Sequence, residues 1–166
     1  MELIDPYNLN ESVFRLLDKD WMLVTAGKPG RFNMMTASWG GFGILWNHPV
    51  SYIFVRPTRY TYEFIEEHER FTLNFFGPGY RKILNFCGSR PGREVDKINM
   101  PGLTPVESDS GSIYFNEARI VMECLKIYFQ DLKPENFIDL KIESNYPKKD
   151  YHRMYIGQIE KIRIMD

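Results

Sequence analysis

The first stretch of the sequence whose residue types suit ligand binding is NMMTASWGG, residues 33–41. It combines short amide and hydroxyl side chains with one large aromatic, and its glycines allow a ligand to approach the backbone closely. Such a strip can hold a polar, planar molecule. The same residues also suit a barrel strand with Trp39 in the core and with Thr36 and Ser38 facing solvent. The strip alone favours this plainer interpretation.

A second stretch, RPTRYT at residues 56–61, brings arginines and hydroxyl groups together. It lies at a predicted strand-to-helix turn, where the first backbone N–H groups of the helix have no partner within it. Arginine forks match phosphate oxygens in a bidentate way, so this turn is a candidate anion pocket. The equally weighted alternative is that Arg56 and Arg59 pair with surface carboxylates such as Glu63 or Glu66.

A third stretch, GREVDK at residues 92–97, is a charged turn after a predicted helix, and alone it is typical of a solvated loop.

Motifs of other site classes are missing from the sequence. Gly40 to Gly43 do not continue into a dinucleotide-binding G-x-G-x-x-G, and neither a phosphate loop nor a G-x-S-x-G nucleophile motif occurs. The three histidines neither cluster nor pair with cysteines at ligand spacing, which predicts no metal site.

The bulk composition narrows the classes of partner. The 166 residues fit a single domain spanning 1–166, with 21 Lys and Arg against 22 Asp and Glu. Because no broad basic face is available, neither a nucleic-acid nor a membrane partner is expected. The opening MELIDPYNLNES is not a signal peptide, so the default location is cytoplasmic. Cys87 and Cys124 are far apart without a pairing motif, and no disulfide is expected.

Hydrophobic patterning predicts a mainly β chain with short helical insertions. A glycine-rich bend should join the second and third strands, and residues 133–152 should form a surface excursion. Six or seven strands without βαβ alternation favour an antiparallel barrel over a parallel sheet. Strands are expected at 21–26, 33–39, 51–56, 71–76, within 112–132 with a break near 116–118, and at 154–164; helices are expected at 62–69 with Thr61 as N-cap and at 80–87 with Gly88 as C-cap.

Taken together, the three stretches resemble the FMN-binding split-barrel flavin reductases, a group that includes the flavoredoxins. The order and separation of the motifs carry the resemblance, which covers residues 33–97 well. It extends weakly to Asp150-Tyr151-His152 and to Ile156-Gly157. The resemblance implies an antiparallel six- or seven-stranded split β-barrel with short peripheral helices, and FMN as the cofactor.

The resemblance also implies roles for individual residues. The residues that match the family's FMN contacts are Asn33, Thr36, Ala37, Ser38, Trp39, Arg56, Arg59, Tyr60, Thr61, Ser89 and Lys97. His152 matches a histidine near the ring system and is the candidate catalytic residue, although it also suits a surface histidine on a strand edge. The sequence departs from the family at Pro91, where a serine is usual, and at Tyr151, which separates Asp150 from His152. The missing hydroxyl contact is then lost or passes to Ser89.

The implied activity is electron transfer from NAD(P)H, a transient reductant, through bound or exchangeable FMN to an acceptor. The resemblance further implies a homodimer with FMN at the subunit interface, with a redox protein as a possible additional partner. An ammonium near a reduced, electron-rich ring stabilises its negative charge, so Lys97 is expected to raise the flavin's potential. The alternatives are a non-enzymatic electron carrier and a barrel that binds another planar ligand. The sequence does not decide between NADH and NADPH.

Overall fold

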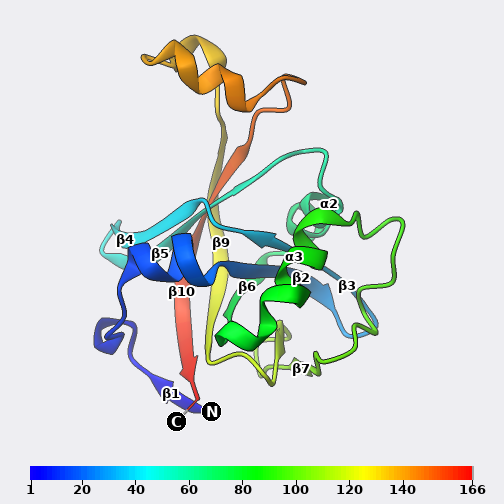
Figure 1. Cartoon of the computed structure of the whole chain (residues 1–166). Coiled ribbons are helices and arrows are strands. Elements are labelled where there is room, and N and C mark those ends of the chain that lie inside the picture. The colour runs from blue at the N-terminus through cyan, green and yellow to red at the C-terminus, as the bar shows by residue number, and fades with distance from the viewer. Residues whose placement is uncertain (166) are drawn as a thin grey trace.

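An antiparallel sheet of eight strands, curled into a barrel, forms the body of the protein (Figure 1). The computed structural model describes residues 1–165. The strands run in the order β3, β2, β6, β9, β10, β5, β4, and β1 pairs with the far part of β10. Their bounds are β1 Glu2–Ile4, β2 Met22–Lys28, β3 Arg31–Ala37, β4 Gly40–Leu45, β5 His48–Val55, β6 Arg70–Phe75, β9 Ile120–Asp131 and β10 Arg153–Ile164. The predicted fold class is confirmed, with more strands than the six or seven expected.

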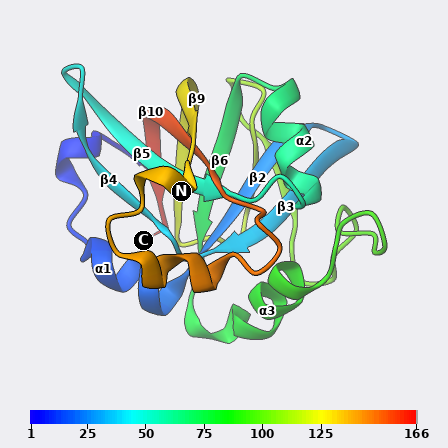
Figure 2. The same ribbon diagram turned by 90° about the horizontal axis from the view of Figure 1, so that it is seen from above.

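The barrel is split between its two outermost strands. β3 and β4 end the strand order on opposite sides, yet only Ser38 and Trp39 separate them in the sequence. The sheet must therefore curve until its edges meet, and the two strands converge at this link when seen from above (Figure 2). No β3–β4 pairing is found among residues 1–165, so the barrel stays open where these two residues lie.

Alternation along the strands fills two hydrophobic clusters, one on each side of the sheet. Neighbouring residues such as Leu23 and Val24 are both completely buried but point to opposite faces, as the period of two requires. Val24 packs inside the barrel with Phe71 and Tyr155. Leu23 packs outside it, beneath helix α3 (Arg81–Ser89). This part of the sheet is covered on both faces and is a rigid support for what lies at its edge.

The helices begin and end at different residues from those expected. α1 is one turn, Val13–Arg15, followed by a π-helical turn over Leu16–Asp20. α2 runs over Tyr60–Glu67 and begins two residues early, so the predicted Thr61 cap is wrong and Arg59 occupies that position. The predicted Gly88 C-cap is also wrong, because α3 continues to Ser89. Gly88 instead lies against Thr36, where an added Cβ would be 3.3 Å from the threonine Cβ.

The expected glycine-rich bend is wrong as well, because Gly40, Gly41 and Gly43 lie within strand β4. The chain turns later, at Trp46 and Asn47, whose φ angles of 49° and 61° are those of a two-residue type I′ hairpin. Gly40 is required for close packing, since a Cβ there would lie 2.5 Å from the carbonyl oxygen of Tyr52. The glycines thus serve a close approach of two strands.

Residues 133–152 form an arm at the ends of β9 and β10, far from the chain termini (Figure 1). The arm contains 3-10 turns at Pro134–Asn136 and Leu140–Asn145. Most of its side chains are exposed, and Ile138 is 99% exposed. The predicted surface excursion is confirmed, with the exception of Tyr146 and His152, which are buried at its base.

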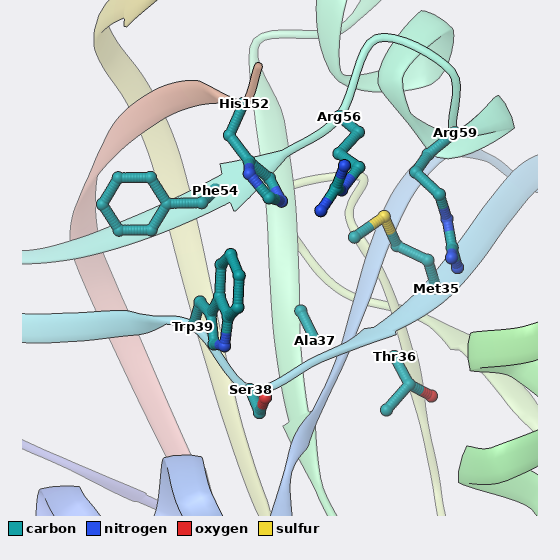
Figure 3. Close-up of a pocket in the computed structure, with 9 residues that line it drawn as sticks. All are labelled: Met35, Thr36, Ala37, Ser38, Trp39, Phe54, Arg56, Arg59 and His152. Atoms are coloured by element: carbon teal, nitrogen blue, oxygen red, sulfur yellow. The ribbon is translucent and has the colours of Figure 1, made fainter. Parts of the chain in front are cut away.

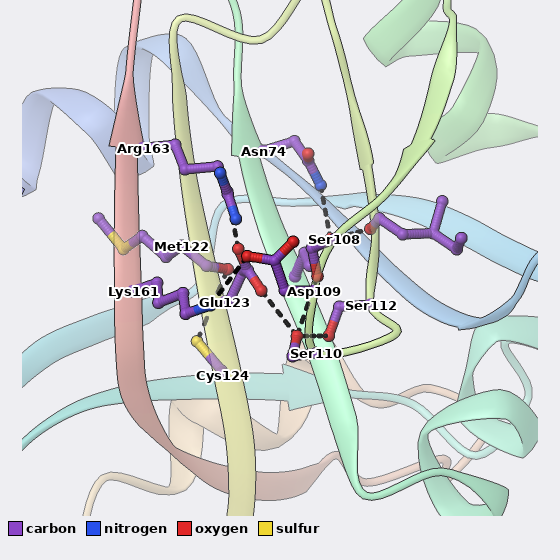
Figure 4. A network of polar contacts seen from close by, with 12 residues as sticks. Asn74, Ser108, Asp109, Ser110, Ser112, Met122, Glu123, Cys124, Lys161 and Arg163 are labelled. Atoms are coloured by element: carbon purple, nitrogen blue, oxygen red, sulfur yellow. Dashed lines mark hydrogen bonds and ion pairs between the residues drawn. The ribbon is translucent and has the colours of Figure 1, made fainter. Parts of the chain in front are cut away.

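A small hairpin, β7 (Pro105–Glu107) with β8 (Ile113–Phe115), is tied to the sheet by the buried carboxylate of Glu123 (Figure 4). Arg163 Nε donates to Glu123 Oε1 over 2.8 Å, and Ser110 Oγ donates to Oε2 over 2.7 Å. Burial alone would raise the pKa of this carboxyl, but these hydrogen bonds outweigh it and hold the pKa below its usual range. Glu123 is therefore charged at neutral pH and anchors the hairpin.

Candidate functional site

A groove opens at the split of the barrel (Figure 3). Its floor is the end of β3 and the Ser38–Trp39 link, and its volume is about 190 Å³. The rings of Trp39 and His152 lie at one end with centroids 5.2 Å apart, and the guanidiniums of Arg56 and Arg59 lie at the other. Trp39 is 48% exposed and so offers a free aromatic surface to a ligand. The plainer interpretation, with Trp39 in the core, is wrong.

A smaller cavity of about 70 Å³ adjoins the groove at the start of α2, and Arg59 lines both. We call this cavity the basic corner. No carboxylate belongs to its lining within the described part of the chain, which is Asn33, Thr58, Arg59, Tyr60, Thr61, Ser89, Arg90, Pro91, Gly92 and Lys97. The corner is thus a concentration of positive charge next to the free N–H groups of a helix start.

Two cations converge on the end of α3 and hold it against β3. Arg59 donates to the carbonyl oxygens of Gly88, over 2.8 Å, and of Cys87, over 3.3 Å. Lys97 Nζ donates to the same Cys87 carbonyl over 2.9 Å and to that of Met34 over 3.1 Å. The last carbonyls of a helix have no partner within it, and cations there also suit its dipole. The three sequence stretches meet through these bonds.

Burial changes the protonation of this cluster. Lys97 is 3% exposed, and this burial is the main reason that its pKa falls to about 8. The charge of Arg59 contributes to the shift, whereas the nearby Cys87 opposes it. The ammonium therefore still carries most of its charge at pH 7. Burial also raises the pKa of the Cys87 thiol, so Cys87 is neutral and contributes its carbonyl rather than a thiolate. Lys97 lines the basic corner and not the groove.

Arg56 is engaged with the arm. Its Nη1 donates to Asp150 over 2.7 Å, its Nη2 donates to the carbonyl of Asn145 over 2.8 Å, and the guanidinium lies 4.9 Å from the centre of the Tyr146 ring. The alternative that Arg56 pairs with a carboxylate therefore holds, but its partner is Asp150, far along the chain, and neither Glu63 nor Glu66. Arg56 therefore anchors the arm beside the groove.

The carboxylates considered as partners of Arg59 are also engaged elsewhere. Glu63 pairs with Arg93, and Glu66 pairs with Arg153. Arg59 instead donates to backbone carbonyl groups and is half-buried, and burial lowers its pKa from the ordinary value. Its charge is not cancelled by a carboxylate among residues 1–165, so it remains available to an anion.

His152 is buried at the edge of the groove and is not a surface histidine. It is 8% exposed, and its Nδ1 lies 2.8 Å from the hydroxyl of Tyr146. Burial, reinforced by the charge of Arg56 and opposed by Asp150, lowers its pKa to about 4. His152 is therefore neutral at pH 7.

Every residue predicted for the site lines one of the two adjoining cavities. The groove contains Thr36, Ala37, Ser38, Trp39, Arg56, Arg59 and His152, and the corner contains Asn33, Arg59, Tyr60, Thr61, Ser89 and Lys97. Asn33 Nδ2 donates a hydrogen bond to Thr61 Oγ1 over 2.8 Å. Ser89 Oγ donates to the Asn85 carbonyl over 2.9 Å. Met35, Thr58 and Gly92 also line the cavities and lie within the three stretches, whereas the lining residues Phe54 and Arg90 lie outside them and were not indicated by the sequence. Their direct contact with FMN, like that of the predicted residues, stays a prediction.

The split antiparallel barrel is a fold seen in solved structures of other proteins. An FMN-binding protein from Thermus thermophilus, with bound p-hydroxybenzaldehyde, is 19% identical with a TM-score of 0.69, over 98% of this chain and 83% of that one. A flavoredoxin from Methanosarcina acetivorans is 21% identical with a TM-score of 0.70, over 98% and 77%. The styrene monooxygenase flavin reductase of Pseudomonas putida S12 is 16% identical with a TM-score of 0.64, over 89% and 80%. At these identities the likeness shows the fold.

The sequence itself places the chain in a family. Residues 14–166 match the flavin reductase like domain, and the chain belongs to that family. No curated protein matches the sequence. Within residues 1–165, no helix is both long and apolar enough to cross a membrane, and no cluster of three or more His, Cys, Asp or Glu residues is arranged to hold a metal ion.

The low pKa of His152 predicts a pH-dependent stability. Between pH 6.5 and 4 the unfolded chain binds a proton at this residue that the folded chain does not, so stability falls as the pH falls through this window. From pH 7 to 5 the loss should be about 2 kcal/mol. Urea unfolding at the two pH values measures it. The variant His152→Gln should lose about 2 kcal/mol less than the parent, and an equal loss in both proteins would contradict the assignment.

Proposed function

We propose that the chain binds FMN across the groove and the basic corner and passes electrons from NAD(P)H through it to an acceptor. The observation that carries this proposal is that the two cavities are neighbours and share Arg59 as a lining residue. FMN has a flat ring system at one end and a phosphate at the other. The groove offers aromatic and small polar side chains to the ring system. The corner offers cations and helix N–H groups to the phosphate.

The corner has donors left for a phosphate. Arg59 carries five N–H donors and Lys97 three, and the bonds to Met34, Cys87 and Gly88 use only two of each. The backbone N–H groups of the first turn of α2 add to them. Lys97 lies on the phosphate side of the site, so we assign it to the terminal anion. Its expected effect on the flavin potential would then act over a longer distance.

The groove of one chain is small for a ring system. Ligand sites usually enclose roughly 300–1,000 Å³, whereas this groove holds about 190 Å³ and is open to solvent. A larger apolar hollow, lined by Phe14, Leu17 and Trp39, adjoins it at the Ser38–Trp39 link. Phe14 is 86% exposed. These features support a homodimer in which the partner subunit covers Trp39 and completes each flavin site.

FMN, when bound, supplies hydride and electron-transfer chemistry, so the chain has to hold it, tune it and leave one face accessible. Thr36, Ala37 and Ser38 form the floor on which the ring would lie. His152 and Trp39 border the accessible end, where a nicotinamide would approach. Because the sequence has no dinucleotide-binding turn, we expect weak discrimination between NADH and NADPH. The cytoplasmic location also stays a prediction.

A non-enzymatic electron carrier is the second candidate function. Two of the solved structures that share this fold are flavoredoxins. In this case FMN stays bound, and a redox protein both delivers electrons to the flavin and removes them. The open groove beside Trp39 suits this function as well as it suits a nicotinamide. A third possibility, another planar ligand in place of FMN, shares the groove but makes no use of the basic corner.

Titration of the purified protein with FMN and riboflavin tests the cofactor and the corner together. A phosphate held by charged donors contributes about 1.5–3 kcal/mol, so FMN should bind at least tenfold more tightly than riboflavin. The variant Arg59→Met should lose that preference, and its riboflavin affinity and unfolding curve are measured beside it, because Arg59 also lines the groove and holds the end of α3. Arg31→Met, which removes an exposed arginine paired with Glu67, is the matched control. Equal affinities of the parent protein for FMN and riboflavin would reject the phosphate site.

Flavin bleaching separates the enzyme from the carrier. The FMN-loaded protein, mixed with NADH or NADPH without air, should lose its visible flavin absorbance within the mixing experiment. Bleaching by dithionite but not by either nicotinamide would instead identify a carrier. A protein that binds no FMN at all would favour the third possibility. Repeating the experiment with air readmitted shows whether the absorbance returns, as turnover requires.

A further inference from the structure

We infer that Tyr146, supplied by the arm, is a positioning residue that fixes His152 as a neutral hydrogen-bond donor pointing its Nε2–H into the groove. The inference starts from one bond, 2.8 Å long, between the Tyr146 hydroxyl and His152 Nδ1. Which atom donates decides where the histidine carries its proton. The use of that proton on a flavin ligand rests on the proposed function.

The burial of Tyr146 decides the direction of the bond. The side chain is 4% exposed, and within residues 1–165 its hydroxyl has His152 Nδ1 as its only hydrogen-bond partner. If Nδ1–H were the donor, the phenolic hydrogen would be buried without an acceptor, which is more costly than an unused oxygen lone pair. The hydroxyl therefore donates to Nδ1. The proton of the neutral imidazole must then lie on Nε2.

The charges around His152 favour the neutral form. Arg56, at the end of β5, lowers the pKa of His152, and Asp150, in the arm, opposes it. Asp150 is already bonded to Arg56 Nη1 over 2.7 Å, so its effect on the histidine is offset. Trp39, which packs against the ring, carries no charge. Burial is the largest cause of the low pKa, Arg56 adds to it, and the imidazole is not a cationic acid near pH 7.

Aromatic residues of the arm pack against Tyr146. Its ring stacks on Phe137 with centroids 5.9 Å apart and meets Tyr151 in a tilted contact with centroids 5.0 Å apart, and the Arg56 guanidinium also lies against it. Tyr151, inserted between Asp150 and His152, thus belongs to the support of Tyr146, and its hydroxyl bonds to Glu143 instead of the histidine. A neutral N–H donates a hydrogen bond without adding a positive charge, so it suits a carbonyl oxygen of a ring system in the groove, and we expect that to be its partner.

Nitrogen-15 NMR of the histidine side chains tests the inference on the flavin-free protein. His152→Gln identifies the signals of His152. In the parent protein at pH 7, Nε2 should be the protonated nitrogen and Nδ1 the unprotonated one. Tyr146→Phe keeps the ring but removes the donor that stabilises the neutral base, so the two tautomers should mix. The pKa of His152 should also rise by about one unit, which is the tenfold effect of one hydrogen bond.

Tyr151→Phe is the matched control, because it removes a hydroxyl from the same aromatic cluster without touching His152. It should leave both the tautomer and the pKa unchanged. A proton on Nδ1 in the parent, or Tyr146→Phe spectra that match those of Tyr151→Phe, would overturn the inference. Addition of FMN should then shift the Nε2–H signal of the parent. If the tautomer is as expected but FMN neither binds nor shifts this signal, the proposed function fails and the role of Tyr146 stands.

Discussion

The carbonyl groups at the end of α3 are buried and need donors from outside the helix, and Arg59 and Lys97 provide them. This pairing is a structural requirement before it is a binding feature, because unpaired buried carbonyls are costly. It holds the start of α2 and the turn at residue 97 against the end of α3, and Lys97 also bonds to the middle of β3 through the Met34 carbonyl. The same two cations keep further N–H donors facing a small cavity. An anion site therefore arises from the way the fold closes its own helix.

The groove has a comparable origin in the topology of the sheet. The outermost strands β3 and β4 are joined by only Ser38 and Trp39, so a tightly curved sheet must leave a gap where they meet. A two-residue link cannot cover this gap, and Trp39 remains half exposed beside it. The arm closes one side by bringing His152 and Tyr146 to the rim. Flat aromatic surface and positive charge are thus adjacent because the split and the helix end are adjacent.

The sequence predicted much of this arrangement, since β-branched and aromatic runs marked most strands and the three motifs marked both cavities. It could not predict strand β4, because glycines suit a turn as well as a close approach of two backbones, and only the Tyr52 carbonyl shows which applies here. The burial of Lys97 could not be predicted, because its neighbours in the sequence are those of a solvated, charged turn. The partners of Arg56 and His152, namely Asp150 and Tyr146, lie in a polar arm without periodicity. Such contacts depend on tertiary structure.

One FMN should occupy both cavities of this fold, and a crystal structure of the protein with FMN shows whether it does. We expect the phosphate in the basic corner, bonded to Arg59 and to the N–H groups at the start of α2. The ring system should lie along Thr36 to Trp39 with His152 at its edge. A structure with FMN bound elsewhere, or with its phosphate in solvent while the corner holds only water, would contradict it.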